Sequence, residues 1–120
     1  AALPLLLKEH RAFACHPRCV AVDSHGRRHV LSRYWANWDK PRPESFREDA
    51  ALVEGLPERE AASVLHDIAS AAESGWDFSS RWQTDPMDLK TIRTTRVVPA
   101  DLNAFVLRLE QNIAEFAAQL

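Results

Sequence analysis

The spacing of hydrophobic residues predicts a mainly helical chain. Apolar side chains recur every three or four residues over 3–14, 57–74 and 101–120, which is the period of one face of an α-helix. In the last segment they form one stripe of about five turns, a strong helix signal. The stripe consists of Leu102, Phe105, Leu109, Ile113, Phe116 and Leu120.

Capping residues indicate where the helices begin and end. Ser45 and Glu48 have the spacing of a capping box, which predicts a short helix over 45–53. Asp101 is expected to cap the last helix with its carboxylate. Gly75 is expected to end the helix that precedes it.

One β-hairpin is expected after the first helix. Two short runs rich in β-branched residues, 19–22 and 29–31, flank the polar sequence 23–26. Turn residues between two such runs favour a hairpin. The stretches 35–44 and 75–100 have neither period and are expected to be irregular. The predicted fold class is therefore mainly α with one short hairpin.

The long loops favour a place within a larger enzyme. Structureless stretches of this length are uncommon in a domain of 120 residues, whereas large scaffolds often carry their chemistry on such loops. We therefore expect residues 1–120 to form a single segment of a bigger catalytic domain.

Composition and charge exclude some classes of partner. Hydrophobic residues make up 46% of the chain and charged residues 27%, which is ordinary for a globular protein. The net charge is −2 and the arginines are interspersed with acids, so no basic stripe for nucleic acid or an anionic membrane forms. The longest apolar run, near Leu3–Leu7, is too short to cross a membrane.

Two cysteines, Cys15 and Cys19, lie close together in the sequence. With His10 or His16 they would form half of a metal site. A structural zinc ion needs four ligands, and the sequence contains no second pair. Two ordinary thiols are the better interpretation, and we expect neither a metal nor an organic cofactor.

The stretches 32–45 and 74–82 carry the residue types of a carbohydrate site. Together they contain all four tryptophans and the only tyrosine, interleaved with arginines and carboxylates. An aromatic ring can cover the apolar face of a sugar, while arginine and carboxylate side chains bond its hydroxyls. In the alternative interpretation the tryptophans pack as core under a helix and the charges form a solvated rim. The residues alone leave both interpretations open.

Five segments, in this order, resemble the trehalases of glycoside hydrolase family 37. They are 33–35 (Arg-Tyr-Trp), 41–45 (Pro-Arg-Pro-Glu-Ser), 74–82 (Ser-Gly-Trp-Asp-Phe-Ser-Ser-Arg-Trp), 92–95 (Ile-Arg-Thr-Thr) and 98–103 (Val-Pro-Ala-Asp-Leu-Asn). The resemblance runs from about Lys8 to the end and is closest to an internal segment of a bacterial α,α-trehalase. It implies part of an (α/α)6 barrel in an enzyme that hydrolyses trehalose to two glucose molecules with inversion.

The resemblance makes Asp77 the general acid that protonates the glycosidic oxygen. Such a group must be protonated at working pH, so we expect its pKa above the ordinary value near 4. Trp76, Phe78 and Trp82 are expected to supply apolar surroundings that raise it. Without the resemblance, Asp77 would be interpreted as a helix cap or a surface charge.

The resemblance also places Arg42, Pro43, Glu44 and Gly75 at substrate-binding positions. Arg42 and Glu44 would bond sugar hydroxyls, on a backbone stiffened by proline. Gly75 would let main chain approach the sugar, because it has no Cβ. The alternatives are an Arg42–Glu44 surface pair and a plain helix C-cap at Gly75.

The family's general base is expected outside this segment. Glu44 matches a binding position, and nothing in the sequence places Asp85 opposite Asp77. The segment alone is therefore expected to be inactive, with trehalose as the small-molecule partner of the complete enzyme.

Two other functions compete with a trehalase segment. One is a non-catalytic trehalase remnant or sugar-binding module, and the other is a small helical interaction domain whose residues only happen to match. A periplasmic location is expected, with the cytoplasm as the alternative, because the family occurs in both compartments of bacteria. The oligomeric state is left open.

Overall fold

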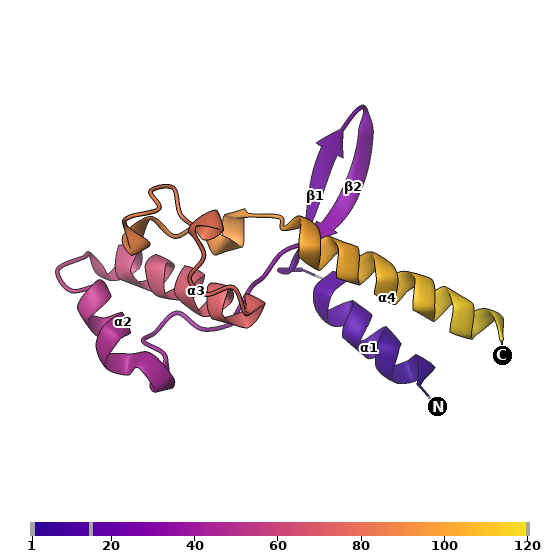
Figure 1. Cartoon of the computed structure of the whole chain (residues 1–120), viewed down its shortest axis with the longest axis horizontal. Helices are drawn as coiled ribbons and strands as arrows, with labels where there is room; N and C mark the ends of the chain where they lie inside the picture. Colours follow the sequence, from indigo (N-terminus) through magenta and orange to yellow (C-terminus); the bar gives the residue numbers. More distant parts are fainter. Residues whose placement is uncertain (1, 15, 120) are drawn as a thin grey trace. The chain divides into compact units, whose positions relative to one another are not determined.

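The protein folds as two compact units. The computed structural model describes residues 2–14 and 16–119. Ala1–Arg33 and Val98–Leu120 form one unit, called here the hairpin unit, and Tyr34–Val97 form the other, called the α3 unit (Figure 1). All of the candidate site residues lie in the α3 unit.

The hairpin unit combines two helices with a two-stranded antiparallel sheet. Helices α1 (Leu3–Ala14) and α4 (Ala100–Ala118) lie side by side, and β1 (Cys19–Ser24) pairs with β2 (Arg27–Ser32) (Figure 1). The two residues between the strands, His25 and Gly26, both have positive φ. That conformation belongs to a two-residue turn whose twist matches the strands. The predicted hairpin is therefore confirmed.

Polar contacts fasten the hairpin unit. Oδ1 of Asn103 accepts the N–H of Ser32 at 2.8 Å, and Nδ2 of Asn103 donates to the Ser32 carbonyl at 2.8 Å. His10 pairs with Glu110 at 2.9 Å, which joins α1 to α4. No described residue of α1 is buried, and the α4 stripe is buried only at its start, since Phe105 is 72% exposed. Leu120, predicted at its end, lies outside the described residues.

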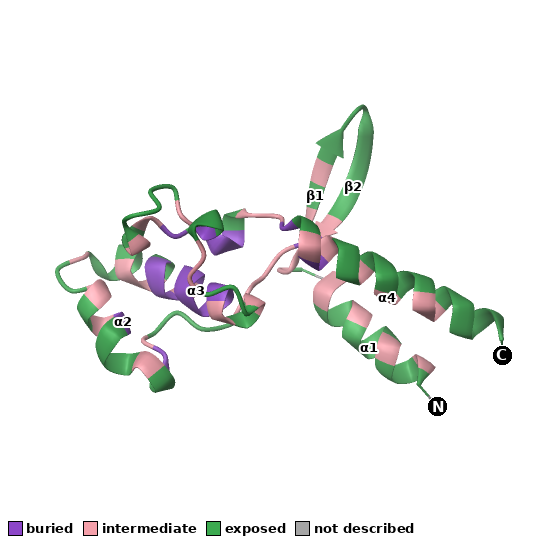
Figure 2. Ribbon diagram, viewed as in Figure 1, coloured by how far each residue is buried: buried purple, intermediate pink, exposed green. Residues whose placement is uncertain are grey.

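The α3 unit is built on one long helix. It contains α2 (Phe46–Leu52), α3 (Glu58–Ser74) and four 3-10 turns, and α3 carries most of the buried residues (Figure 2). The turns are Pro43–Ser45, Ser80–Trp82, Leu89–Thr91 and Thr94–Arg96. Val64, Ile68 and Ala71 share one face of α3, because they are four and three residues apart. They form the core with Trp82 and Ile92.

The helices occur where they are predicted, but the capping bond at Ser45 is absent and the predicted cap at Asp101 is wrong. Ser45 is the residue before α2 as predicted, but its side chain makes no capping bond, and its N–H donates to the Arg42 carbonyl instead of to Glu48. Helix α4 begins at Ala100 after Pro99, so Asp101 lies inside the first turn instead of before it. The mainly helical fold class with one hairpin is confirmed. The (α/α)6 barrel remains a prediction.

Candidate active site

The stretch leading into the Pro-Arg-Pro-Glu loop is anchored along α3. The backbone N–H of Trp35 donates to Glu73, and that of Ala36 donates to the hydroxyl of Ser70, both at 3.0 Å. The Trp35 ring meets the His66 ring edge-on, with 4.5 Å between centroids. These bonds tie the backbone at Trp35 and Ala36 to side chains of α3.

Arg42 is held by a buried carboxylate on α2. Its Nε and Nη2 donate to the two oxygens of Asp49 at 2.8 Å each, and its backbone N–H donates to Asp49 Oδ2 at 2.9 Å. Arg42 is 8% exposed and Asp49 is 3% exposed. This is the bidentate arrangement in which a planar guanidinium is most strongly oriented.

The Arg42–Asp49 pair raises the pKa of Arg42 and lowers the pKa of Asp49. The hydrogen bond to Asp49 raises the pKa of Arg42 despite the opposing effect of burial, and the charges of Asp49, Glu44 and Asp77 raise it further. Burial alone would raise the pKa of Asp49, but the hydrogen bonds from Arg42 outweigh it and the pKa is lowered. Both groups are therefore charged near neutral pH.

The segment that carries Asp77 is a tight turn at the end of α3. Gly75 ends the helix in the left-handed conformation, with φ of 72°. The carbonyl of Trp76 accepts the N–H of Ser79 at 2.8 Å and the indole Nε1–H of Trp82 at 2.9 Å. Since Trp82 is fully buried in the core, the turn is tied to the core of the α3 unit.

The two candidate loops meet at Arg42. Its guanidinium carbon lies 5.0 Å from the centroid of the Phe78 ring, a cation–π distance, and Phe78 directly follows Asp77. The charges of Asp77 and Glu44 also act on Arg42. The structure thus brings the loop of Arg42 and Glu44 against the turn that carries Asp77, although Arg42 and Asp77 are 35 residues apart in the sequence.

A hollow of about 260 Å³ lies beside Arg42. Its lining residues come from the Pro-Arg-Pro-Glu loop and from one side of α3; they are Trp38, Arg42, Pro43, Glu44, Ala69 and Ala72. Neither Gly75 nor Asp77 lines it. An aromatic ring, a fixed cation and an exposed carboxylate in one hollow suit a ligand with both apolar faces and hydroxyls.

The surroundings of Asp77 differ from the expectation. Asp77 is exposed, as is Trp76 at 54%, and the Arg81 guanidinium covers the Trp76 ring at 4.8 Å. Trp82 is a core residue, not a wall of the site, because its ring packs edge-on against Tyr34 inside the α3 unit. Phe78 is the aromatic that lies against the Arg42 guanidinium.

Sequence reasoning missed Asp49. It lies in a charged run, 47–49, that has no apolar period and therefore gives no sign that one carboxylate is buried. The available signal was its place in the first turn of a predicted helix, seven residues after an arginine that stands between two prolines. That signal is weak, since most such acids are solvated.

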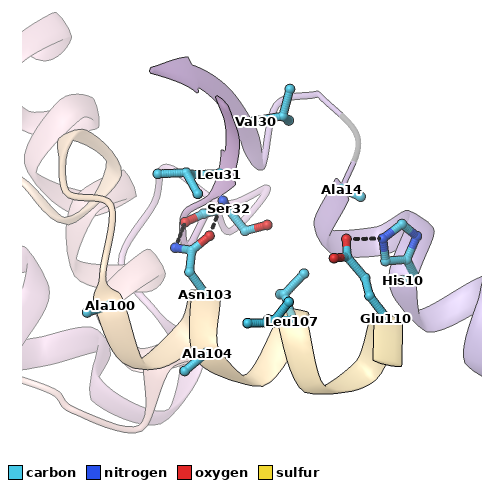
Figure 3. Close-up of a pocket in the computed structure, with 11 residues that line it drawn as sticks. His10, Ala14, Val30, Leu31, Ser32, Ala100, Asn103, Ala104, Leu107 and Glu110 are labelled. Carbon is cyan, nitrogen blue, oxygen red and sulfur yellow. Dashed lines mark hydrogen bonds and ion pairs between the residues drawn. The ribbon is translucent and has the colours of Figure 1, made fainter. Parts of the chain in front are cut away.

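A second hollow, of about 590 Å³, is in the hairpin unit. Figure 3 shows His10 and Glu110 pointing toward one another at one end of it and Asn103 bonded to Ser32 at the other. Its lining is mainly alanine, valine and leucine from α1, β2 and α4. It contains none of the residues predicted to bind sugar.

Other types of site are not apparent among residues 2–14 and 16–119. No three His, Cys, Asp or Glu side chains in those ranges are grouped to hold a metal ion. Cys19 is a free thiol, and Cys15 lies outside the described residues. No described helix is long and apolar enough to span a membrane.

Comparison with known proteins identifies the family of this arrangement. The sequence model of the trehalase family matches residues 1–120. A protein of Oryza sativa subsp. japonica named "Probable trehalase" is 50% identical over 115 residues, which are 95% of this chain and 20% of that protein. "Periplasmic trehalase" proteins of Salmonella dublin and Salmonella enteritidis are each 54% identical over 89 residues, 74% of this chain and 16% of theirs. The chain thus spans about one fifth or less of the relatives it matches.

Proposed function

The chain belongs to the trehalase family, and we propose that it supplies the general acid and part of the sugar site of an enzyme that hydrolyses α,α-trehalose to two glucose molecules. The observation that carries the proposal is the contact between the loop of Arg42 and the turn of Asp77. The Arg42 guanidinium lies over the Phe78 ring, and the charges of Asp77 and Glu44 raise its pKa. Membership of the family removes the alternative of a helical domain with a chance match.

Arg42 and Glu44 bind and orient the sugar in this proposal. The free N–H groups of a fixed guanidinium donate to adjacent hydroxyls, and the Glu44 carboxylate accepts from another. Trp38, in the same hollow, offers an apolar ring face to the C–H side of a glucose unit. Ordering the sugar before reaction lowers the entropic part of the barrier.

Asp77 acts as the proton donor. Its carboxyl group protonates the glycosidic oxygen as the bond to the anomeric carbon breaks, so the leaving glucose departs as a neutral alcohol. A carboxylate base activates water on the opposite face of the sugar, and inversion requires acid and base to be about 6.5–9.5 Å apart. The base is proposed to come from a part of the enzyme outside these 120 residues, because Asp49 is paired to Arg42 and Glu44 binds sugar.

Loss of the acid tests the proposal. In the full-length protein that contains residues 1–120, Asp77→Asn removes the proton and keeps the shape of the side chain. Glucose release from trehalose is expected to fall at least about 100-fold, mainly in kcat. Asp85→Asn is the matched control, because Asp85 is an exposed acid of the same irregular stretch whose side chain bonds only locally, to Met87. Equal turnover in the two variants would contradict the role of Asp77.

The proposed compartment is the periplasm of a bacterium. The support is the name of the Salmonella relatives, which are 54% identical over the matched region. Fractionation of cells expressing the full-length protein tests it, and activity retained in the cytoplasmic fraction would contradict it.

A further inference from the structure

The Asp49 carboxylate is buried in the α3 unit and has no part in the chemistry proposed above. Burial of a carboxylate is costly unless it is paired and hydrogen-bonded. Asp49 meets that condition entirely through one residue, since it accepts three hydrogen bonds from Arg42.

Those bonds occupy one edge of the Arg42 guanidinium, and the other edge makes no bond to Asp49. Nε and Nη2 of Arg42 donate to Asp49, whereas Nη1 has no hydrogen-bond partner among the residues that the structure describes. Arg42 also lines the 260 Å³ hollow. The Asp49 contact therefore decides which N–H groups of Arg42 remain available to a ligand.

The guanidinium is restrained on two further sides. Its carbon lies 5.0 Å from the centroid of the Phe78 ring, and Arg42 itself stands between Pro41 and Pro43, whose φ angles are fixed. A side chain held at its edge, its face and its backbone has lost rotamer freedom before any ligand binds. Binding then carries a smaller entropic cost.

Stability alone does not account for such a pair. Replacing a buried ion pair by apolar residues of similar volume is often neutral or stabilising, so a buried Arg–Asp pair is weak support for a purely structural role. What the pair provides, and an apolar pair cannot, is a guanidinium of defined orientation.

We propose that Asp49 is a positioning residue, which holds the Arg42 guanidinium in the orientation that bonds the sugar. The inference rests on the proposed function, because it takes Arg42 as a sugar-binding group. It adds a residue that contacts neither the sugar nor the reacting atoms.

The test is a double-mutant cycle in the full-length protein. Asp49→Asn keeps the shape of the side chain but removes the charge. It is expected to lower kcat/KM for trehalose about 10- to 100-fold, mainly by raising KM, because the guanidinium is displaced. In an Arg42→Ala background the same substitution is expected to change kcat/KM less than about 2-fold, since Asp49 then has nothing to position.

Asp67→Asn is the matched control. Asp67 is a second buried carboxylate of the α3 unit, 5% exposed, and it accepts the N–H of Thr95 at 2.7 Å without contacting Arg42. Asp67→Asn is expected to lower the melting temperature and to leave kcat/KM per folded molecule within about 2-fold of the wild type. Circular dichroism gives the folded fraction for every variant.

Three results would overturn the inference. They are a kcat/KM of Asp49→Asn equal to that of Asp67→Asn, a loss confined to kcat, and a loss of the same factor with and without Arg42. If Asp49→Asn yields no folded protein, Asp49→Glu takes its place, because it keeps the charge and moves the carboxylate by one methylene. It too is expected to raise KM about 10-fold, and an unchanged KM would overturn the inference.

Failure of the proposed function gives a different pattern. If the site does not bind trehalose, Arg42→Ala alone leaves kcat/KM unchanged and Asp77→Asn retains turnover. If only the role of Asp49 is wrong, Arg42→Ala lowers kcat/KM while Asp49→Asn does not, or the two losses multiply.

Discussion

The α3 unit and the hairpin unit contain similar numbers of residues but differ in what holds them together. In the α3 unit, one face of α3 packs on Trp82 and Ile92, and the Arg42–Asp49 pair is buried as well. In the hairpin unit, α1 has no buried residue among those described, and polar contacts such as Asn103–Ser32 join the elements.

This difference suggests that the α3 unit determines activity and that the hairpin unit contributes to stability only. Every contact that shapes the candidate site, from Arg42–Asp49 to Trp82–Trp76, lies within residues 34–97. Substitutions of the residues that make these contacts should therefore change activity as well as stability. Substitutions in the hairpin unit should change stability alone. The predictions below test this separation in the full-length protein.

The largest effect is expected at Trp82. Trp82→Ala removes a fully buried ring and the indole bond to Trp76, and it should lower the free energy of unfolding by about 3–5 kcal/mol. Denaturant unfolding measures this loss. Trp82→Phe, which keeps a ring but loses the Nε1–H donor, should lose much less. A loss below about 1 kcal/mol for Trp82→Ala would contradict the assignment of Trp82 to the core.

A somewhat smaller and pH-dependent effect is expected at Asp49. The pKa of Asp49 is lowered in the folded state, so its charged pair stabilises the fold above the ordinary value of about 3.9 and this contribution is lost as pH falls through the lowered value. Asp49→Asn should cost about 1.5–3 kcal/mol near pH 7. The difference from wild type should shrink below pH 4 in melting experiments, and a difference that grows with acid would contradict the pairing.

In the hairpin unit, Asn103 is the matched probe. Asn103→Ala removes both bonds to Ser32, which is buried, and should cost about 1–2 kcal/mol. Because Asn103 belongs to the other unit, kcat/KM per folded molecule should stay within about 2-fold. A 10-fold loss of kcat/KM would show that the site depends on the hairpin unit.

The smallest effect on stability is expected at two glycines of the α3 unit, which differ in their proposed role in binding. Gly75 and Gly55 have φ of 72° and 81°, and a Cβ at either would meet no atom within 4 Å. Alanine at either should therefore cost a similar amount, about 1 kcal/mol, from left-handed strain alone. Only Gly75→Ala should raise KM for trehalose, because Gly75 is the proposed point of close approach. Equal KM values in both variants would leave Gly75 as a helix cap and nothing more.

Local patterns predicted the elements but not the contacts between them. The period of three and four residues identifies α3, and the turn residues 23–26 identify the hairpin, because both signals are contained in a few consecutive residues. Ser45 precedes α2 as predicted but makes no side-chain capping bond, whereas the cap at Asp101 failed because α4 begins at Ala100, directly after Pro99.

The site was predicted only in part for the same reason. The residue types of the aromatic loops and their resemblance to a family pointed to Arg42 and Asp77. The partner of Arg42 depends on how α2 packs, and the burial of Trp82 depends on α3, so neither Asp49 nor the core role of Trp82 could be obtained from the local sequence.

The most direct measurement compares two substrates of the Asp77→Asn variant. Trehalose needs a proton on its departing glucose, whereas α-glucosyl fluoride releases fluoride without one. If Asp77 is the general acid, trehalose turnover by the full-length variant falls about 1000-fold, and fluoride release stays within about 10-fold of wild type. Equal losses on both substrates, or no loss on trehalose, would contradict the account.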